Sequence, residues 1–103
     1  MKDKIYISGK ITGDANYMIH FAEAEESLKN QGYIVVNPAK ILSNMPKETT
    51  YEEYMELSIK LLSMCNEIFL LCNWWDSAGA LREHAFAKFM HIPMTEEREY
   101  NDY

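Results

Sequence analysis

The stretch Ile5-Tyr6-Ile7-Ser8-Gly9-Lys10-Ile11-Thr12-Gly13-Asp14 contains the first regular element of the chain and indicates the fold class. Its apolar start, residues 5–7, predicts a short buried strand. Gly9 and Gly13 follow, so the strand is expected to pass through a loop into a helix. Such a loop either makes a tight strand-to-helix turn or lets the backbone approach an anion or a sugar. The glycine spacing matches neither the P-loop nor the GxGxxG dinucleotide fingerprint, and both interpretations stay open.

Strand-like and helix-like stretches alternate along the rest of the chain. Apolar or β-branched runs predict further strands at residues 33–36, 67–71 and 92–94. Helical patterns begin after Asp14 or Asn16, after Thr49 or Thr50, and at residue 80. A long loop over residues 39–50 is expected to hold a short helix near residues 41 and 42. This alternation predicts an α/β fold in which helices cover both faces of a parallel sheet.

Length and composition favour one small globular domain. The chain has 103 residues, of which 48% are hydrophobic and 25% are charged, as in an ordinary folded domain. No apolar run approaches the roughly 20 residues that span a bilayer, and residues 1–4 lack the apolar region of a signal peptide. We therefore expect a cytoplasmic protein without membrane contact, with a single domain at residues 1–94 and an acidic tail at residues 95–103.

The net charge of −6 is shared equally between this tail and this domain. Residues 95–103 hold four acidic residues and one basic residue, and the other 94 residues hold twelve and nine. This balance argues against nucleic-acid polymers, whose phosphates need many Lys and Arg partners. A small anion remains possible, because backbone N–H groups can hold a phosphate. We expect no metal ion or other cofactor, since His20, His84 and His91 are scattered without ligand spacing.

Three loops are expected to meet at the carboxyl ends of the strands, where open parallel sheets bind their ligands. They are residues 8–14, the Asn37-Pro38 turn and residues 73–83. Ser77 and Gly79 lie where the last helix begins, so the backbone N–H groups there can face a phosphate. Trp75 either packs against the protein or stacks on a base.

Glu83 is the candidate for chemistry in the third loop and its helix. Ala80 and Ala87 share its helical face and leave room around the carboxylate. A carboxylate in this setting can attack a sugar carbon as a nucleophile. The alternative is a glutamate that the helix dipole favours, paired with Arg82 or Lys88.

Three segments resemble the nucleoside 2-deoxyribosyltransferase-like superfamily, and the similarity covers about residues 4–94. They are Tyr6-Ile7-Ser8-Gly9-Lys10-Ile11-Thr12-Gly13, Gly32-Tyr33-Ile34-Val35-Val36-Asn37-Pro38 and Ser77-Ala78-Gly79-Ala80-Leu81-Arg82-Glu83 followed by Ala87. The third is the strongest match, and it is most similar to a small bacterial and phage branch. The resemblance implies a flavodoxin-like three-layer sandwich with a short, mostly parallel sheet. It also implies cleavage or transfer at the N-glycosidic bond of a deoxynucleoside or its 5′-monophosphate.

The resemblance also assigns roles to residues. Glu83 becomes the nucleophile, and Tyr6 matches a tyrosine near the sugar and the carboxylate. Ser77 and Gly79 match positions that contact phosphate. The full set expected to bind substrate comprises Ser8, Gly9, Lys10, Gly13, Asn37, Trp75, Ser77 and Gly79.

The chain departs from the superfamily pattern at two positions. Asn66 stands where many active members have an aspartate, and an amide cannot act as a proton donor by ionising. Asp76 is the candidate replacement. The first loop carries Lys10 alone where the monophosphate hydrolases have arginine, and lysine lacks bidentate recognition. The alternative function is therefore a nucleotide-binding or sensing module of the same fold without catalysis.

The resemblance further implies a homodimer or larger homo-oligomer, because members of this superfamily often complete their sites with a neighbouring subunit. The helix that begins near residue 50 is the candidate interface, since its apolar side chains lie on more than one side. These side chains are Tyr51, Tyr54, Leu57, Leu61 and Leu62.

Overall fold

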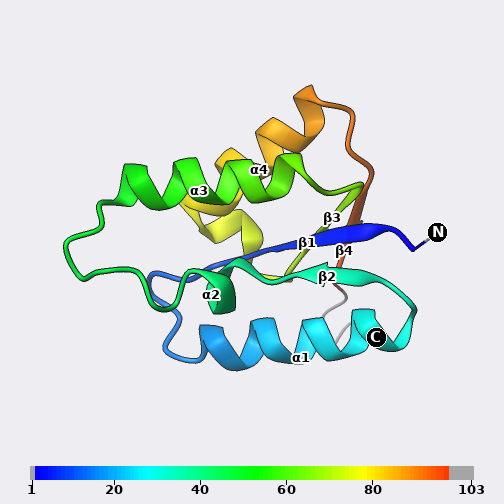
Figure 1. The fold of residues 1–103 in the computed structure, drawn as a ribbon, viewed down its shortest axis with the longest axis horizontal. Helices are drawn as coiled ribbons and strands as arrows, with labels where there is room; N and C mark the ends of the chain where they lie inside the picture. Colours follow the sequence, from blue (N-terminus) through cyan, green and yellow to red (C-terminus); the bar gives the residue numbers. More distant parts are fainter. Residues whose placement is uncertain (1, 98–103) are drawn as a thin grey trace.

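The computed structural model describes residues 2–97, which form a four-stranded parallel sheet between two layers of helices (Figure 1). The strands are β1 (Lys4–Ser8), β2 (Ile34–Val36), β3 (Glu67–Leu70) and β4 (Met94–Glu96). Their order in the sheet is β2-β1-β3-β4, and every neighbouring pair runs parallel. The predicted α/β class and the parallel sheet are therefore confirmed.

Helices cover both faces of this sheet. One face carries α1 (Tyr17–Asn30) and α2 (Pro38–Ile41), and the other carries α3 (Tyr51–Ser63) and α4 (Ala78–Phe89), as Figure 1 shows. A short 3₁₀ helix, η1 (Trp74–Asp76), leads into α4. None of the helices among residues 2–97 is long and apolar enough to cross a membrane.

The alternation of side chains along β1 positions the site. Ile5 and Ile7 point into the core beneath α1, whereas Tyr6 packs with Leu62 and Ala87 on the side of α3 and α4. Successive residues of a strand face opposite sides of a sheet, so Ser8 shares the face of Tyr6. Both side chains are completely buried, which places two hydroxyl groups under α4.

Side-chain caps begin the two helices on this face. Thr50 and Glu53 form a capping box at α3, with hydrogen bonds of 2.8 and 3.1 Å between each side chain and the other's backbone N–H. Ser77 caps α4 by accepting the N–H of Ala80 at 3.1 Å. Each cap satisfies N–H groups that the first helical turn leaves without partners. Of the two threonines predicted as caps, the second is the one used.

The final strand lies two residues later than the sequence predicted. The expected strand was residues 92–94, but β4 spans Met94–Glu96 and thus includes the first two residues assigned to the acidic tail. The carbonyl of Pro93 accepts the N–H of Ile68, and Pro93 has no N–H of its own to extend the ladder. Residues 98–103 of the expected tail lie outside the described residues.

Two further expectations need correction. The short helix predicted near residues 41 and 42 lies earlier, at Pro38–Ile41, because Asn37 caps it and Pro38 fits its first turn. In the candidate interface helix, Leu62 is not available to a partner, because it is fully buried in the core. Tyr51 and Leu57 of the same helix are exposed.

Candidate active site

Glu83 lies at the centre of a buried hydrogen-bonded group beneath α4. Tyr6 donates its phenolic hydrogen to Glu83 Oε2 at 2.5 Å, and Ser8 donates its hydroxyl hydrogen to Glu83 Oε1 at 2.6 Å. Each carboxylate oxygen therefore has a donor of its own. Tyr6 and Ser8 come from one face of β1, as the period of a strand requires. We call these three residues the carboxylate triad.

The sequence of α4 makes room for this carboxylate. Glu83 is only 7% exposed, and Ala80 and Ala87 on the same face are also buried. Alanines at these positions bring the helix close to the sheet, so a glutamate side chain reaches the hydroxyls of β1. Neither Arg82 nor Lys88 forms an ion pair with Glu83; Arg82 instead binds Glu52 through both guanidinium nitrogens. The ion pair of Glu83 with Arg82 or Lys88 that the alternative interpretation expected is therefore absent from the described residues.

Burial sets the protonation of the triad. The loss of water raises the pKa of Glu83 from an ordinary 4.5 to about 7, although the hydrogen bonds from Ser8 and Tyr6 act in the opposite direction. Burial also raises the pKa of Tyr6 well above its ordinary value of 10.0, and the neighbouring Glu83 charge adds to this shift. At neutral pH the tyrosine thus remains a hydrogen donor while the glutamate titrates.

A second polar group joins the loops that follow β1 and β3. Lys10 Nζ lies 2.5 Å from Asp76 Oδ2, and the Lys10 backbone N–H donates to Asn73 Oδ1 at 3.2 Å. The Asn73 amide donates to Asp14 at 3.3 Å, and Asp14 also contacts the His20 ring at 2.8 Å. We call these five residues the strand-end network. It holds two loops together that are about sixty residues apart in the chain.

The glycines of the first loop have structural reasons to be glycine. A Cβ atom on Gly9 would lie 2.5–2.8 Å from three side-chain carbons of Leu71, so this position admits no side chain. Gly13 has φ +88° in the turn that the Ile11 carbonyl and the Asp14 N–H close, a conformation that favours glycine. Of the two interpretations of this loop, the tight turn is the one supported by these contacts.

The other residues expected to bind substrate occupy different settings. Asn37 is buried, where it caps α2 and donates to Glu25 at 3.0 Å, so it links α1 to α2. Trp75 is 64% exposed in η1. Ser77 is engaged as the cap of α4, and Gly79 faces Met55 of α3, whose sulfur would lie 3.3 Å from an added Cβ.

Comparison with known proteins places this arrangement in a family. A family model described as "Domain of unknown function (DUF4406)" matches residues 3–96. The chain belongs to this family. A search of curated proteins gives no match.

The DUF4406 chain also resembles a solved structure. That structure is of the 2-deoxyribosyltransferase from the psychrotolerant bacterium Bacillus psychrosaccharolyticus, described as a biocatalyst for the synthesis of antiviral and antitumoral nucleosides. The TM-score is 0.72 and the identity 17%, over 90% of this chain and 70% of that chain. The likeness shows a shared fold, and it confirms the flavodoxin-like architecture predicted from the sequence.

Asn66 of the DUF4406 domain lies at the amino ends of the strands, away from the carboxylate triad. Its backbone N–H donates to the Lys4 carbonyl, and its side chain accepts the Lys4 N–H at 2.9 Å. Both residues lie at the amino ends of β1 and β3, whereas Ser8 lies at the carboxyl end of β1. The amide at position 66 therefore holds two strands together and forms no hydrogen bond with Glu83.

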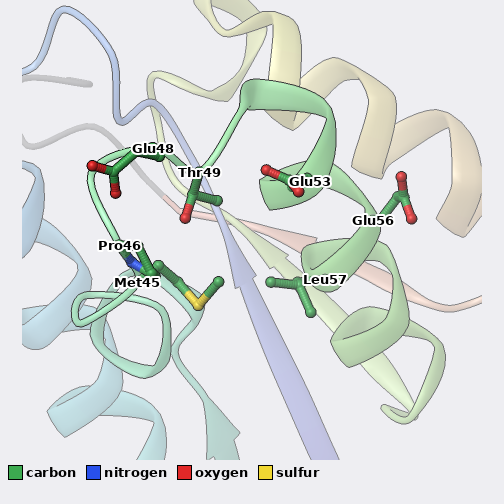
Figure 2. Close-up of a pocket in the computed structure, with 7 residues that line it drawn as sticks. All are labelled: Met45, Pro46, Glu48, Thr49, Glu53, Glu56 and Leu57. Carbon is green, nitrogen blue, oxygen red and sulfur yellow. The ribbon is translucent and has the colours of Figure 1, made fainter.

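Two hollows of the surface lie outside the carboxylate triad. One of about 470 Å³ lies between the loop after α2 and helix α3, where Met45 and Leu57 face each other across it and glutamates surround it (Figure 2). A second, of about 480 Å³, runs between α3 and α4 and is lined by Met55, Arg82 and Phe86 among others. Neither hollow is lined by Tyr6, Ser8 or Glu83. The triad is therefore a candidate site because of its hydrogen-bonded side chains, and not because it lines one of these hollows.

Sequence reasoning missed several residues that contact the predicted ones. Asn73 and His20 belong to the strand-end network, and Ser58 of α3 forms a side-chain hydrogen bond with Tyr6. Asn73 is the first polar side chain of the loop after β3, and this position was the signal available for it. His20 and Ser58 have no such signal, because their partners lie on other elements. Trp74, the neighbour of Trp75, stacks on His84 with ring centroids 4.5 Å apart.

Proposed function

We propose that this protein belongs to the bacterial and phage branch of the nucleoside 2-deoxyribosyltransferase-like superfamily. It cleaves or transfers the N-glycosidic bond of a deoxynucleoside or its 5′-monophosphate, and Glu83 is the nucleophile. The single observation that carries this proposal is the carboxylate triad. A buried glutamate with a hydroxyl donor on each oxygen, at the carboxyl end of a parallel sheet, is placed where this fold binds ligands. The fold shared with a 2-deoxyribosyltransferase supports the substrate class.

The chemistry requires two steps at the sugar. A Glu83 oxygen bonds to C1′ as the C1′–N bond breaks, and the electron pair of that bond leaves with the base, which takes up a proton. Water, or a second base, then forms a new bond to C1′ from the opposite face and releases the carboxylate, while its own proton goes to solvent. Two inversions give net retention at C1′. Tyr6 and Ser8 hold the carboxylate in one orientation, which is the main requirement for an efficient nucleophile.

Asp76 is the candidate that the sequence offers for protonating the leaving base. Its carboxylate is paired with Lys10 at 2.5 Å, and an ionised carboxylate has no proton to donate. This ion pair has to open before Asp76 can act as an acid. Trp75, exposed in η1 beside these loops, is the candidate for stacking on the base. The remaining candidate contacts are Gly9, Lys10, Gly13, Asn37, Ser77 and Gly79.

The direct test is base release from a panel of deoxynucleosides and their 5′-monophosphates. Chromatography should detect free base with the wild-type chain, and Glu83→Gln and Glu83→Ala should abolish it. Glu26→Gln, which removes an exposed carboxylate of α1, is the matched control and should leave release unchanged. No release from any substrate, or release that survives Glu83→Ala, contradicts the proposed catalysis.

The second candidate function is a nucleotide-binding or sensing module. The observation that favours it is the state of Glu83, which is 7% exposed and has a pKa near neutrality, so a large share of the molecules carries an uncharged carboxyl. Calorimetric titration of the same panel distinguishes the two functions. Binding without base release supports the module, whereas binding with release supports the enzyme.

A homo-oligomer is part of the proposal as well. The outer face of α4 presents Leu81, which is 45% exposed, and Phe89, which is 81% exposed. Exposed apolar side chains that gather on one surface can mark a protein–protein interface. Light scattering should give the mass of a dimer or larger assembly for the wild-type chain and the mass of a monomer for Phe89→Ser. Monomer masses for both proteins would contradict the proposed oligomer.

A further inference from the structure

The carboxyl ends of β1 and β3 carry more carboxylates than cations. The ionisable side chains of residues 2–97 that hydrogen-bond within or to the loops after these strands are Lys10, Asp14, His20, Asp76, Glu96 and Glu97. Glu97 accepts the backbone N–H of Cys72 at 3.0 Å, and Glu96 accepts the Trp74 indole N–H at 3.3 Å. Four of these six side chains are acidic, so the potential at this edge is unfavourable for an anion.

Lys10, the lysine of this edge, already has a counter-ion. Its ammonium group lies 2.5 Å from Asp76 Oδ2, and its side chain is only 24% exposed. Asn73 fixes the Lys10 backbone at the same time. A phosphate that approached this ammonium group would have to displace Asp76. The displaced carboxylate would then remain beside a doubly charged phosphate, which costs electrostatic energy.

The first turn of α4 offers little compensation. Helix N-termini bind anions through N–H groups without partners, but the Ser77 hydroxyl already accepts the Ala80 N–H at 3.1 Å. Gly79 packs against Met55, and the Tyr51 hydroxyl would lie 3.7 Å from a Cβ at this glycine. The end of the helix is therefore partly occupied by the protein's own groups.

We propose that the substrate of this site is the uncharged deoxynucleoside, and that Asp76 is the residue that selects against the 5′-monophosphate. The inference rests on the proposed function and names its substrate. A free 5′-hydroxyl both donates and accepts hydrogen bonds, so it can donate to a carboxylate of the strand-end network where a phosphate is repelled. Asp76 acts in this way by neutralising Lys10 and by contributing its own negative charge.

The test compares the dissociation constants of each deoxynucleoside and its 5′-monophosphate by calorimetry on the full chain. The wild type should bind the nucleoside more tightly. Asp76→Asn should tighten monophosphate binding relative to nucleoside by roughly fivefold or more, because it frees Lys10 and removes one negative charge. Asp76→Ser is a second variant with the same expected direction. Glu26→Gln removes one charge on α1 and should leave the ratio at the wild-type value.

Each outcome has a distinct meaning. Tighter wild-type binding of the monophosphate overturns the inference but leaves the proposed function standing. An unchanged ratio in both Asp76 variants overturns the role of Asp76. Binding of neither ligand to the wild type overturns this inference together with the proposed function, and base release then shows no activity either.

Discussion

The Tyr6 hydroxyl donates a 2.5 Å hydrogen bond to Glu83 Oε2, although 77 positions separate the two residues in the chain. Both side chains are buried, and Ser8 donates to the other oxygen of the same carboxylate. Burial raises the pKa of Tyr6 well above 10.0, so the phenol keeps its proton across the physiological range. The tyrosine is therefore a permanent donor, and the charge of the group is decided by Glu83 alone.

Removing that donor should make the glutamate a weaker acid. Tyr6→Phe keeps the ring in the core but deletes the hydrogen bond that lowers the pKa of Glu83, so this pKa should rise above about 7. A buried carboxylate that loses a donor also costs about 1–3 kcal/mol of stability. Carbon-13 NMR titration of the glutamate carboxyl and chemical denaturation measure the two effects. An unchanged pKa in Tyr6→Phe would show that Ser8 alone orients the carboxylate.

The stability of the fold should fall as the pH rises past the unfolded pKa of Glu83. The folded pKa of about 7 exceeds the ordinary 4.5, so the folded state binds this proton more tightly than the unfolded state. Stability is then fully present below pH 4.5 and is lost progressively up to about pH 7. Between pH 5 and pH 8 the loss amounts to about 2–3 kcal/mol at ~1.4 kcal/mol per pKa unit.

Glu83→Gln isolates this contribution, because glutamine has nearly the same shape and no charge. Denaturation curves of both chains at pH 5 and pH 8 should show the wild type losing stability relative to the variant. Parallel curves, with a constant difference between the two chains, would mean that Glu83 titrates near its ordinary value.

Base release should depend on pH in the opposite direction to stability. In the proposed reaction only the ionised Glu83 attacks C1′, and with a pKa of about 7 its ionised fraction falls roughly tenfold from pH 8 to pH 6. The initial rate should fall by the same factor, and Tyr6→Phe should move the midpoint to higher pH. Glu83→Gln at each pH supplies the blank for acid-catalysed loss of base. A rate that is greater at pH 6 than at pH 8 would exclude an ionised glutamate as the nucleophile.

Gly9 should tolerate no side chain, because it packs closely against Leu71. An alanine Cβ would lie 2.5 Å from Leu71 Cδ1 and 2.8 Å from Leu71 Cβ, so Gly9→Ala should cost about 1–3 kcal/mol of stability. Gly32→Ala is the comparison: nothing lies within 4 Å of its Cβ, and only its φ of +97° opposes a side chain, at about 1 kcal/mol. Thermal denaturation of both variants ranks the costs. A Gly9→Ala chain as stable as the wild type would refute the close contact.

The sequence was sufficient to predict the α/β layers of the fold and its parallel sheet. Apolar runs alternating with helical patterns located β1, α1 and β3 to within a few residues. The resemblance selected Tyr6 and Glu83, and the structure joins these two residues by a hydrogen bond. The small residues Ala80 and Ala87 were expected to leave room around Glu83, whereas all three residues are buried. The apolar runs and the helical patterns are local patterns, which can be recognised in a single sequence.

What sequence reasoning missed depends on distant contacts. Gly9 is required by Leu71, and Lys10 is neutralised by Asp76, 66 positions away. The last strand begins at Met94 and not at residue 92 as predicted, because Pro93 lacks an N–H group to donate to the neighbouring strand. The cap that Asn37 forms on α2 and its hydrogen bond to Glu25 of α1 were not predicted either. Each of these outcomes depends on contacts between residues that are distant in the sequence. Such contacts cannot be predicted from the spacing of residues along the chain.

The two hydrogen bonds of Glu83 have a consequence for the order in which the protein is made. They join residues that are 75 and 77 positions apart, so Tyr6 and Ser8 are synthesised long before Glu83. Until α4 has left the ribosome and docked, Tyr6 and Ser8 lack the acceptor that their burial requires. Contacts of such long sequence separation form late and slow the folding of a chain. A nascent chain thus completes the carboxylate triad and docks α4 onto the sheet in one event.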